Sequence, residues 1–486
     1  MVSSDSPVTC SMSRTFQSER LLSLIRDGEP ISLSQRLSLT ARLAFPAIIA
    51  QVSSIVMQYI DAAMVGSLGA EPSASIGLVS TTTWLFSGLC SAVVAGFSVQ
   101  VAHYIGANEF RSARDVLRQA FSFTLIFSVA LSLTGVLISG RLPVWLGGDA
   151  SIRKSASDYF RIYSLFLPVM QMYCLSSSML RYSGNMRIPS AMGMLMCLLD
   201  VVFNFFLIFP SRPITLFGAQ CTLPGAGLGV RGAAFGTGAA ICVVALVLLL
   251  YLIRSSKTLR LVGERGSFVP TEPVIKRSIQ IGLPMGLEHL LLCGAQIIST
   301  VIVAPLGVVA IAANSFAVTA ESLCYMPGYG VADAATTLVG QSLGAKRPSL
   351  ARKFAHITVG TGMLVMTVMG VIMYIFAPQI IGLMTPVEEI RSLGVSVLRI
   401  EAFAEPMFAA SIVAYNVFVG AADTSAPCLM NLASMWGVRL TLAAVLAPVL
   451  GLKGVWIAMC VELCFRGVIF LIRLFREKWL KRYESN

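Results

Sequence analysis

Residues 104–114 read YIGANEFRSAR, and residues 342–352 read SLGAKRPSLAR. The Gly-Ala step and the Ala-Arg step of the two stretches are 238 positions apart. A register held over roughly 140 residues indicates an internal duplication, which has to be recognised before a fold is assigned. The chain therefore consists of two related halves. The same shift relates Pro46 to Pro284, Leu68-Gly69 to Leu306-Gly307, and Pro189 to Pro427.

The composition is that of a membrane protein. The 486 residues are 56% hydrophobic and 12% charged, with a mean hydropathy of +0.78, whereas a soluble domain carries about 25% charge. Apolar stretches of about 20 residues recur along the chain, each long enough to cross a bilayer as a helix. They are too long and too continuously apolar for a barrel. We expect twelve spans, near 39–65, 72–102, 115–140, 157–180, 189–210, 230–253, 277–304, 310–341, 353–377, 393–419, 427–450 and 452–474.

Basic residues predict the orientation in the membrane. One set of short connections and the C-terminal tail carry most of them, and positive loops stay on the cytoplasmic side. Both termini are therefore expected in the cytoplasm, which requires an even number of spans. The net charge of +12 is then mostly this bias together with affinity for anionic membrane lipid, and nucleic-acid binding is disfavoured. The basic set comprises Arg111, Arg114, Arg118, Arg181, Arg187, Arg254, Lys257, Arg260, Arg265, Lys276, Arg277, Lys346, Arg347, Arg352, Lys353, Arg473, Arg476, Lys478, Lys481 and Arg482.

Each copy of the repeat covers six spans, an even number, so the copies have the same orientation. This predicts an all-α polytopic fold of twelve transmembrane helices, in two six-helix lobes related by a pseudo-two-fold axis along the membrane normal. Near the end of each copy, the offset between matching residues falls from 238 to 222 positions. The difference is a longer outer loop around 211–227 in the first half. The expected organisation is a cytoplasmic N-terminal tail at 1–37, an N-lobe at 38–254 with spans 1–6, a cytoplasmic linker at 255–275, a C-lobe at 276–475 with spans 7–12, and a cytoplasmic tail at 476–486.

Cysteines and histidines show no pattern that carries chemistry. The eleven cysteines have no metal-ligand spacing, and most fall inside spans, where free Cys behaves as a small apolar residue. The three histidines, at positions 103, 289 and 356, form no cluster. A membrane-embedded enzyme with a His-rich metal centre is therefore disfavoured. We expect no catalytic residues and no cofactor.

Four motifs carry a resemblance to a known family. They are YIDAAMVG at 59–66, APLG at 304–307, VGQSLGA at 339–345 and GAADTSAP at 420–427. With these motifs in this order and with twelve spans, the chain resembles the multidrug and toxic compound extrusion (MATE) family of cation-coupled antiporters over residues 36–475. The resemblance implies a V-shaped pair of lobes, alternating access, and export of organic cations or amphiphilic compounds in exchange for H⁺ or Na⁺.

Asp61 is the first candidate for cation coupling. An ionisable group inside the bilayer costs about 2.5–3.5 kcal/mol on insertion scales, so its presence needs a reason. Asp61 lies in the first-span motif of the family, and a carboxylate there can take up a proton or hold Na⁺ with nearby oxygens. The alternative is a structural aspartate that caps the end of the first span beside Gly66.

Three further polar residues complete the predicted first-lobe ion site. Asp200 and Asn204 are one helical turn apart and share a face, in the reverse of the order that the family often has. Thr237 resembles a family position near this ion site, although packing of small residues explains it equally well. If the coupling ion is Na⁺, we expect Asp61 and Asp200 to hold it.

The same lobe offers two candidates for substrate contact and one for a hinge. Gln171 and Tyr173 are polar residues in the fourth span. Pro46 lies within the first span, where a missing backbone hydrogen bond favours a kink, and such a kink would let the helix bend when Asp61 changes its charge. The repeat mate Pro284 leaves open a purely architectural role.

The second lobe carries more acids at depth. Some branches of the family have a glutamate in the seventh span and an acid in the tenth, and Glu288 and Glu405 each fall about one turn from those positions. Glu401 and Glu405 are spaced i, i+4 and share a face, and two close carboxylates attract a proton or a cation. We expect Glu288, Glu401 and Glu405 to bind substrate or a second cation, and the alternative is ion pairing with Arg399 or Arg439. The full set is Glu288, Glu321, Asp333, Glu401, Glu405 and Glu462.

These observations predict a secondary active multidrug exporter that works as a monomer in the plasma (inner) membrane. Its partners would be small cationic or amphiphilic substrates and membrane lipid. The alternative within transport is a lipid-linked oligosaccharide flippase of the wider superfamily, but such proteins tend to have more spans and basic cavities. A channel and an enzyme are the alternatives from other classes. The sequence leaves open whether H⁺ or Na⁺ is the coupling ion, since carboxylates bind both.

Overall fold

A computed structural model describes residues 18–216 and 219–484. Within these ranges the regular secondary structure is helical apart from one antiparallel hairpin, which pairs β1 (Pro210–Leu216) with β2 (Ala219–Ala226) where the longer outer loop was predicted. The first half contains α2 (Leu33–Gly66), α3 (Ala70–Gly106), α4 (Phe110–Ile138), α5 (Leu142–Trp145), α6 (Ala150–Tyr182), α7 (Arg187–Ile208) and α8 (Val230–Arg254). The second half contains α9 (Glu272–Val303), η1 (Ala304–Leu306), α10 (Val308–Gly344), α11 (Pro348–Met384), α12 (Glu388–Glu401), α13 (Glu405–Gly420), α14 (Ser425–Ser434), η2 (Met435–Arg439), α15 (Leu440–Leu450), α16 (Leu452–Phe475) and α17 (Lys481–Glu484).

The helices account for the twelve predicted spans. In the described part of the chain, ten helical segments are long and apolar enough to cross a membrane, and the bent pair α12–α13 makes an eleventh. The twelfth is α6, which is 33 residues long. It packs against α3, α4 and α8, so its polar side chains have protein neighbours rather than lipid alone. One detail of the prediction is wrong, because the tenth span is not one helix but bends by 57° between α12 and α13.

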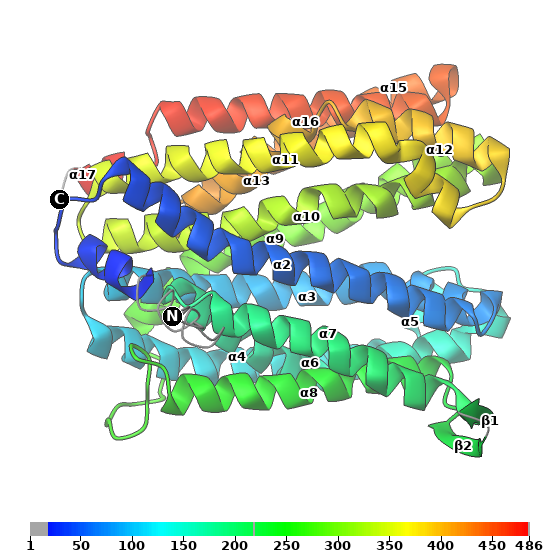
Figure 1. Cartoon of the computed structure of the whole chain (residues 1–486), viewed down its shortest axis with the longest axis horizontal. Coiled ribbons are helices and arrows are strands. Elements are labelled where there is room, and N and C mark those ends of the chain that lie inside the picture. The colour runs from blue at the N-terminus through cyan, green and yellow to red at the C-terminus, as the bar shows by residue number, and fades with distance from the viewer. Residues whose placement is uncertain (1–17, 217–218, 485–486) are drawn as a thin grey trace, which may run out of the picture.

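Figure 1 shows the long helices lying roughly along one axis. α2 begins and α16 ends at the left of this view, as an even number of spans requires, whereas the β-hairpin lies at the right. The left end also carries the connections that the sequence marks as basic. We call it the basic end; it comprises the turns at 107–109, 183–186, 345–347 and 421–424 and the linker at 255–271. The other end is called the opposite end.

Turns repeat their backbone conformation with the sequence register. Each turn at the basic end closes with a backbone bond from the third residue after the helix back into its last turn, as when Glu109 N–H donates to the Tyr104 carbonyl and Arg347 N–H donates to the Ser342 carbonyl. The duplication therefore extends from the sequence to the backbone. Six of the residues with positive φ form three pairs 238 positions apart, namely Gly69 and Gly307, Asn108 and Lys346, and Gly184 and Ala422.

The two halves cross at the basic end through repeat-related glycines. A Cβ added to Gly106 in α3 would lie 2.1 Å from the carbonyl oxygen of Gln341, and one added to Gly344 in α10 would lie 2.0 Å from that of His103. His103 and Gln341 are themselves repeat mates. Each glycine therefore contacts the residue three positions before the other glycine. This reciprocal contact is what a pseudo-two-fold axis between α3 and α10 produces.

Burial along these two helices is uneven. In α3, residues 92–106 are almost continuously buried, whereas exposed side chains recur through residues 70–91. In α10, residues 327–343 are almost continuously buried, and exposed side chains recur through residues 308–319. The lobes therefore pack tightly at the basic end and less tightly toward the opposite end.

Both terminal segments pack against the helices. Residues 18–26 are helical, and the side chains of Leu22 and Ile25 are buried in the core of the second half. An N-terminal capping box at Ser32 starts α2 at Leu33, five residues before the predicted start of the N-lobe. The described part of the predicted tail therefore packs against the helices or belongs to α2, and its cytoplasmic location stays a prediction. Near the other terminus, Trp479 and Leu480 are buried in the same core.

Candidate functional site

A cavity in the first lobe opens beside Asp61. Its volume is about 480 Å³, and Asp61 from α2, Asn204 from α7 and Thr237 from α8 all line it. These are three of the four residues predicted for the ion site. Among its described lining residues Asp61 is the only charged one, and none is basic. The complete lining is Gln58, Asp61, Ala62, Val65, Ser73, Ile76, Thr83, Tyr159, Asn204, Ala233 and Thr237.

Asp200 lies directly behind this wall. Its side chain is fully buried, next to the carboxyl of Asp61 and the hydroxyl of Thr237. The amide of Asn204 donates to Oδ1 of Asp61 over 2.9 Å. The structure therefore brings all four predicted first-lobe residues together, from three different helices.

Close packing of α7 against α8 holds the amide of Asn204 in place. A Cβ added to Gly236 would lie 2.1 Å from Oδ1 of Asn204. The backbone of α8 can approach the amide only because residue 236 has no side chain. The small residues of the 232–237 segment thus serve both helix packing and the shape of the site.

The carboxyl groups in this site lack cationic partners. Neither Asp61 nor Asp200 takes part in an ion pair with a described residue, and both oxygens of Asp200 are buried without a hydrogen-bond donor. Two carboxylates this close repel one another, and burial away from water adds a large solvation cost. A proton or a small cation between them removes both penalties. The phenol of Tyr159, on the cavity wall beside both acids, adds an oxygen that sequence reasoning did not select.

Gln171 and Tyr173 lie apart from this cavity. Both are on α6, where the buried amide of Gln171 donates to the Cys90 carbonyl over 3.4 Å, and Tyr173 packs into the core of the first lobe. Neither lines the cavity beside Asp61. Their role as substrate contacts stays a prediction.

Pro46 lies inside α2, next to a close contact between that helix and α10. A Cβ added to Gly330 would lie 2.6 Å from the backbone nitrogen of Ile48, two residues after the proline. α2 also contacts α10 nearer its other end, where the Tyr59 hydroxyl donates to the Thr319 carbonyl. Pro46 thus lies next to the contact between the lobes, and its role as a hinge stays a prediction.

In the second lobe, both carboxyl oxygens of Glu288 accept hydrogen bonds. It lies on α9, is 5% exposed, and accepts hydrogen bonds from the Tyr415 hydroxyl at 2.7 Å and the Asn431 amide at 2.6 Å. These two donors come from α13 and α14, so Glu288 joins three helices. Neither donor was selected from the sequence, because an uncharged Tyr or Asn inside a span does not stand out.

Glu401 and Glu405 form a different environment. Glu401 ends α12 and Glu405 begins α13, so the bend separates them and they do not share one helix face as predicted. They are nevertheless close to one another and to Glu321 of α10. Both side chains are fully buried, and none of their four oxygens has a hydrogen-bond partner.

The nearby arginines do not satisfy these two acids. Arg399 donates to the Tyr374 carbonyl at 3.3 Å and lies over the Tyr374 ring. Arg439, at the end of η2, lies near Glu401 but donates to methionine sulfurs. Within the described residues, neither acid forms a salt bridge with Arg399 or Arg439. The structure therefore does not support the predicted alternative of ion pairing with these arginines. The pair that does form is Glu462 with Arg466, through two bonds of 2.8 Å.

Polar contacts between the lobes gather at the basic end. Arg181 of α6 and Asp333 of α10 form an ion pair at 2.5 Å. The Thr337 hydroxyl donates to the Arg181 carbonyl at 3.1 Å, and the Gln341 amide donates to the Tyr182 carbonyl at 2.9 Å. These bonds close the basic end between the lobes. Sequence reasoning noted Arg181 as a loop charge and Asp333 as a deep acid without pairing them.

Comparison with known proteins also finds the duplication and relates most of the chain to one family. The family model described as MatE matches twice, at residues 46–206 and 284–445, and the second match begins 238 residues after the first. The probable multidrug resistance protein NorM of Thermotoga maritima is 24% identical over 446 residues, covering 91% of this chain and 92% of the relative. The multidrug resistance protein MdtK of Yersinia pestis is 24% identical over 450 residues, covering 91% and 95%. A solved multidrug resistance MATE family transporter in an outward-facing conformation has a TM-score of 0.84 at 19% identity, covering 96% and 99%, which shows the shared fold.

Proposed function

The chain belongs to the MATE family, and from that premise we propose that it is a secondary active exporter that exchanges organic cations or amphiphilic compounds for H⁺ or Na⁺. The observation that carries the proposal is the first-lobe cavity, whose one charged lining group is the carboxyl of Asp61. A cavity with acid and no base attracts cations and disfavours an anionic cargo. The names of the relatives, multidrug resistance proteins, agree with this substrate class.

Coupling follows from the two neighbouring carboxyls of that site. The inward ion neutralises one negative charge between Asp61 and Asp200, and a cationic substrate competes for the same charge. Competition of this kind gives a coupling free energy between the two flows. Inward movement of one charge supplies about 2.3 kcal/mol per 100 mV of membrane potential, in addition to the concentration term.

Alternating access would be transmitted through α2. Its Asp61 accepts a bond from Asn204 of the first lobe at 2.9 Å, and its Tyr59 donates to α10 of the second. A change of charge at Asp61 weakens the first bond and lets α2 shift against α10. Pro46 lies where this shift would be absorbed, because a proline leaves one backbone carbonyl of the helix without its bond. The basic end, closed by Arg181 and Asp333, would open in the other state.

In the second lobe, Glu401 and Glu405 are the groups that most need a proton or a cation. Their four oxygens are buried without donors, whereas Glu288 has two. We assign the second cation to Glu401 and Glu405 and a structural or substrate-contact role to Glu288. The protein would act as a monomer in the plasma membrane, with both termini in the cytoplasm.

The test is ethidium efflux from proteoliposomes under an imposed pH gradient or an imposed Na⁺ gradient. Wild-type protein is expected to respond to at least one gradient, and Asp61→Asn is expected to abolish efflux at unchanged expression. Glu389→Gln is the matched control, because it makes the same acid-to-amide change on an exposed side chain. Full ethidium efflux by Asp61→Asn would contradict the assignment of Asp61 as the coupling residue. Flipping of a lipid-linked oligosaccharide without ethidium efflux would establish the flippase alternative instead.

A further inference from the structure

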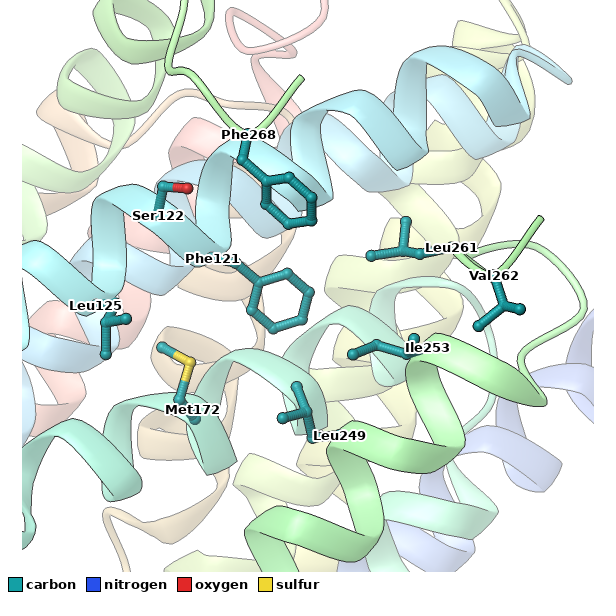
Figure 2. A pocket seen from close by; sticks show the side chains of 9 residues that line it. All are labelled: Phe121, Ser122, Leu125, Met172, Leu249, Ile253, Leu261, Val262 and Phe268. Atoms are coloured by element: carbon teal, nitrogen blue, oxygen red, sulfur yellow. The ribbon is translucent and has the colours of Figure 1, made fainter. Parts of the chain in front are cut away.

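A second cavity lies on the lipid-facing side of the first lobe, at the basic end. Its volume is about 410 Å³. Side chains from α4, α6, α8 and the linker point into a common space (Figure 2). Of the nine lining residues only Ser122 is polar, and none is charged. They are Phe121, Ser122, Leu125, Met172, Leu249, Ile253, Leu261, Val262 and Phe268.

The linker forms a fixed roof over this cavity. Glu264 forms an ion pair with Arg114 of α4 at 2.7 Å, and its carbonyl accepts from the buried Arg118 at 3.1 Å. The backbone of Leu261 donates to the Ile253 carbonyl at the end of α8 over 2.9 Å. These bonds hold the loop in position without help from a ligand. The cavity is therefore preformed, which lowers the ordering cost of binding.

The walls of the cavity continue into surfaces that face lipid. Leu125 on α4 is 44% exposed, and Phe268 on the roof is 52% exposed. Val269, next to Phe268, is 70% exposed. An apolar cavity stays dry unless an apolar molecule fills it, and an acyl chain is the apolar molecule that the bilayer supplies.

Three arginines lie close to lining residues of this cavity along the chain. Arg254 follows Ile253, Arg260 precedes Leu261, and Arg265 lies between Val262 and Phe268. All three side chains are exposed, and none forms an ion pair within the described residues. Basic residues at a membrane surface attract anionic headgroups. The same charges repel the cationic compounds proposed as transport substrates.

We propose that this cavity binds one anionic phospholipid of the adjacent leaflet, with an acyl chain among Phe121, Leu249 and Phe268 and the phosphate near Arg260 and Arg265. The lipid would tie the linker between the lobes to the membrane surface. The proposal does not depend on which compounds the protein exports.

Native mass spectrometry of the delipidated protein, mixed with equal amounts of phosphatidylglycerol and phosphatidylcholine of the same chains, tests this site. One phosphatidylglycerol is expected to remain per chain. Leu249→Trp fills the cavity and should remove it, whereas Leu246→Trp, on the same helix, 58% exposed and outside the lining, should retain it. Arg260→Gln with Arg265→Gln should lower the preference for phosphatidylglycerol by about fivefold for each charge removed.

A second variant keeps the test decisive if Leu249→Trp fails to fold. Phe268→Ser removes an exposed ring of the roof and should also release the lipid. Equal retention of the two lipids by the wild type would overturn the proposed headgroup preference. Retention by folded Leu249→Trp, or by Phe268→Ser, would overturn the cavity as the site. Displacement of the lipid by ethidium would show that the cavity takes a transport substrate and would overturn the proposal as well.

Discussion

Gly344→Ala is expected to open the basic end of the protein without unfolding either lobe. Gly344 of α10 contacts the backbone of α3, and the new Cβ would lie 2.0 Å from the carbonyl oxygen of His103. Ordinary contacts begin at 3.4 Å, so the two helices must separate by at least about 1.4 Å. Overpacking of this kind costs about 1–3 kcal/mol. The clash lies between the lobes, so the cost falls on the closed state.

That cost corresponds to a shift of about 5- to 150-fold toward the state that is open at the basic end. Spin labels on unnatural amino acids at Arg111 and Ser349 would report it, because both side chains are exposed and the positions are repeat mates. The pulsed-EPR distance distribution should move to longer distances in Gly344→Ala. Gly360→Ala is the matched control, since a Cβ there meets nothing within 4 Å. Identical distributions for wild type, Gly344→Ala and Gly360→Ala would refute the reasoning.

Three further perturbations test separate parts of the structure. Asp333→Asn should raise the population that is open at the basic end, because Arg181 loses its carboxylate partner. The swap R181D/D333R should restore closure in the same EPR measurement. A swap that closes no better than Asp333→Asn would contradict the role of this ion pair. Glu401→Gln should raise the thermal unfolding midpoint in the absence of Na⁺, because it removes a buried carboxylate without a hydrogen-bond partner, and burying one ion costs several kcal/mol; a lower midpoint would show that the carboxylate has a partner. Ala422→Gly should raise the midpoint, because the left-handed conformation costs a non-glycine residue about 1–2 kcal/mol, and Gly184→Ala at the repeat mate should lower it.

The fold was largely predictable because two features of the sequence, the duplication and the apolar runs, constrain it. The shared register of 46–206 and 284–445 predicts two lobes of equal orientation, and apolar runs of sufficient length predict spans. The bend between Glu401 and Glu405 was missed, although the sequence carries a signal for it. Pro406 directly follows Glu405 and lies in the first turn of α13. Proline lacks the backbone N–H that continues a helix and favours the first position of a new one, so it marks the boundary between α12 and α13.

The first-lobe site was predictable because charge inside a span is rare and has few explanations. Asp61, Asp200, Asn204 and Thr237 converge as expected. Tyr159 was missed because a tyrosine near a span end is common at membrane interfaces and carries no charge to single it out.

In the second lobe, acid positions alone could not separate satisfied from unsatisfied carboxyls. The donors to Glu288 lie 127 and 143 residues away along the chain. Only the three-dimensional arrangement shows that Glu288 has partners and that Glu401 and Glu405 have none.

Simultaneous recording of ion influx and ethidium efflux in one proteoliposome preparation tests whether the protein couples the two fluxes through Asp61. An internal pH dye or labelled Na⁺ would report the ion while ethidium fluorescence reports the substrate. Ion influx is expected to require ethidium, ethidium efflux is expected to require the ion gradient, and Asp61→Asn is expected to abolish both fluxes. Ethidium efflux that proceeds at the same rate without any ion gradient, or in Asp61→Asn, would contradict coupled exchange at Asp61.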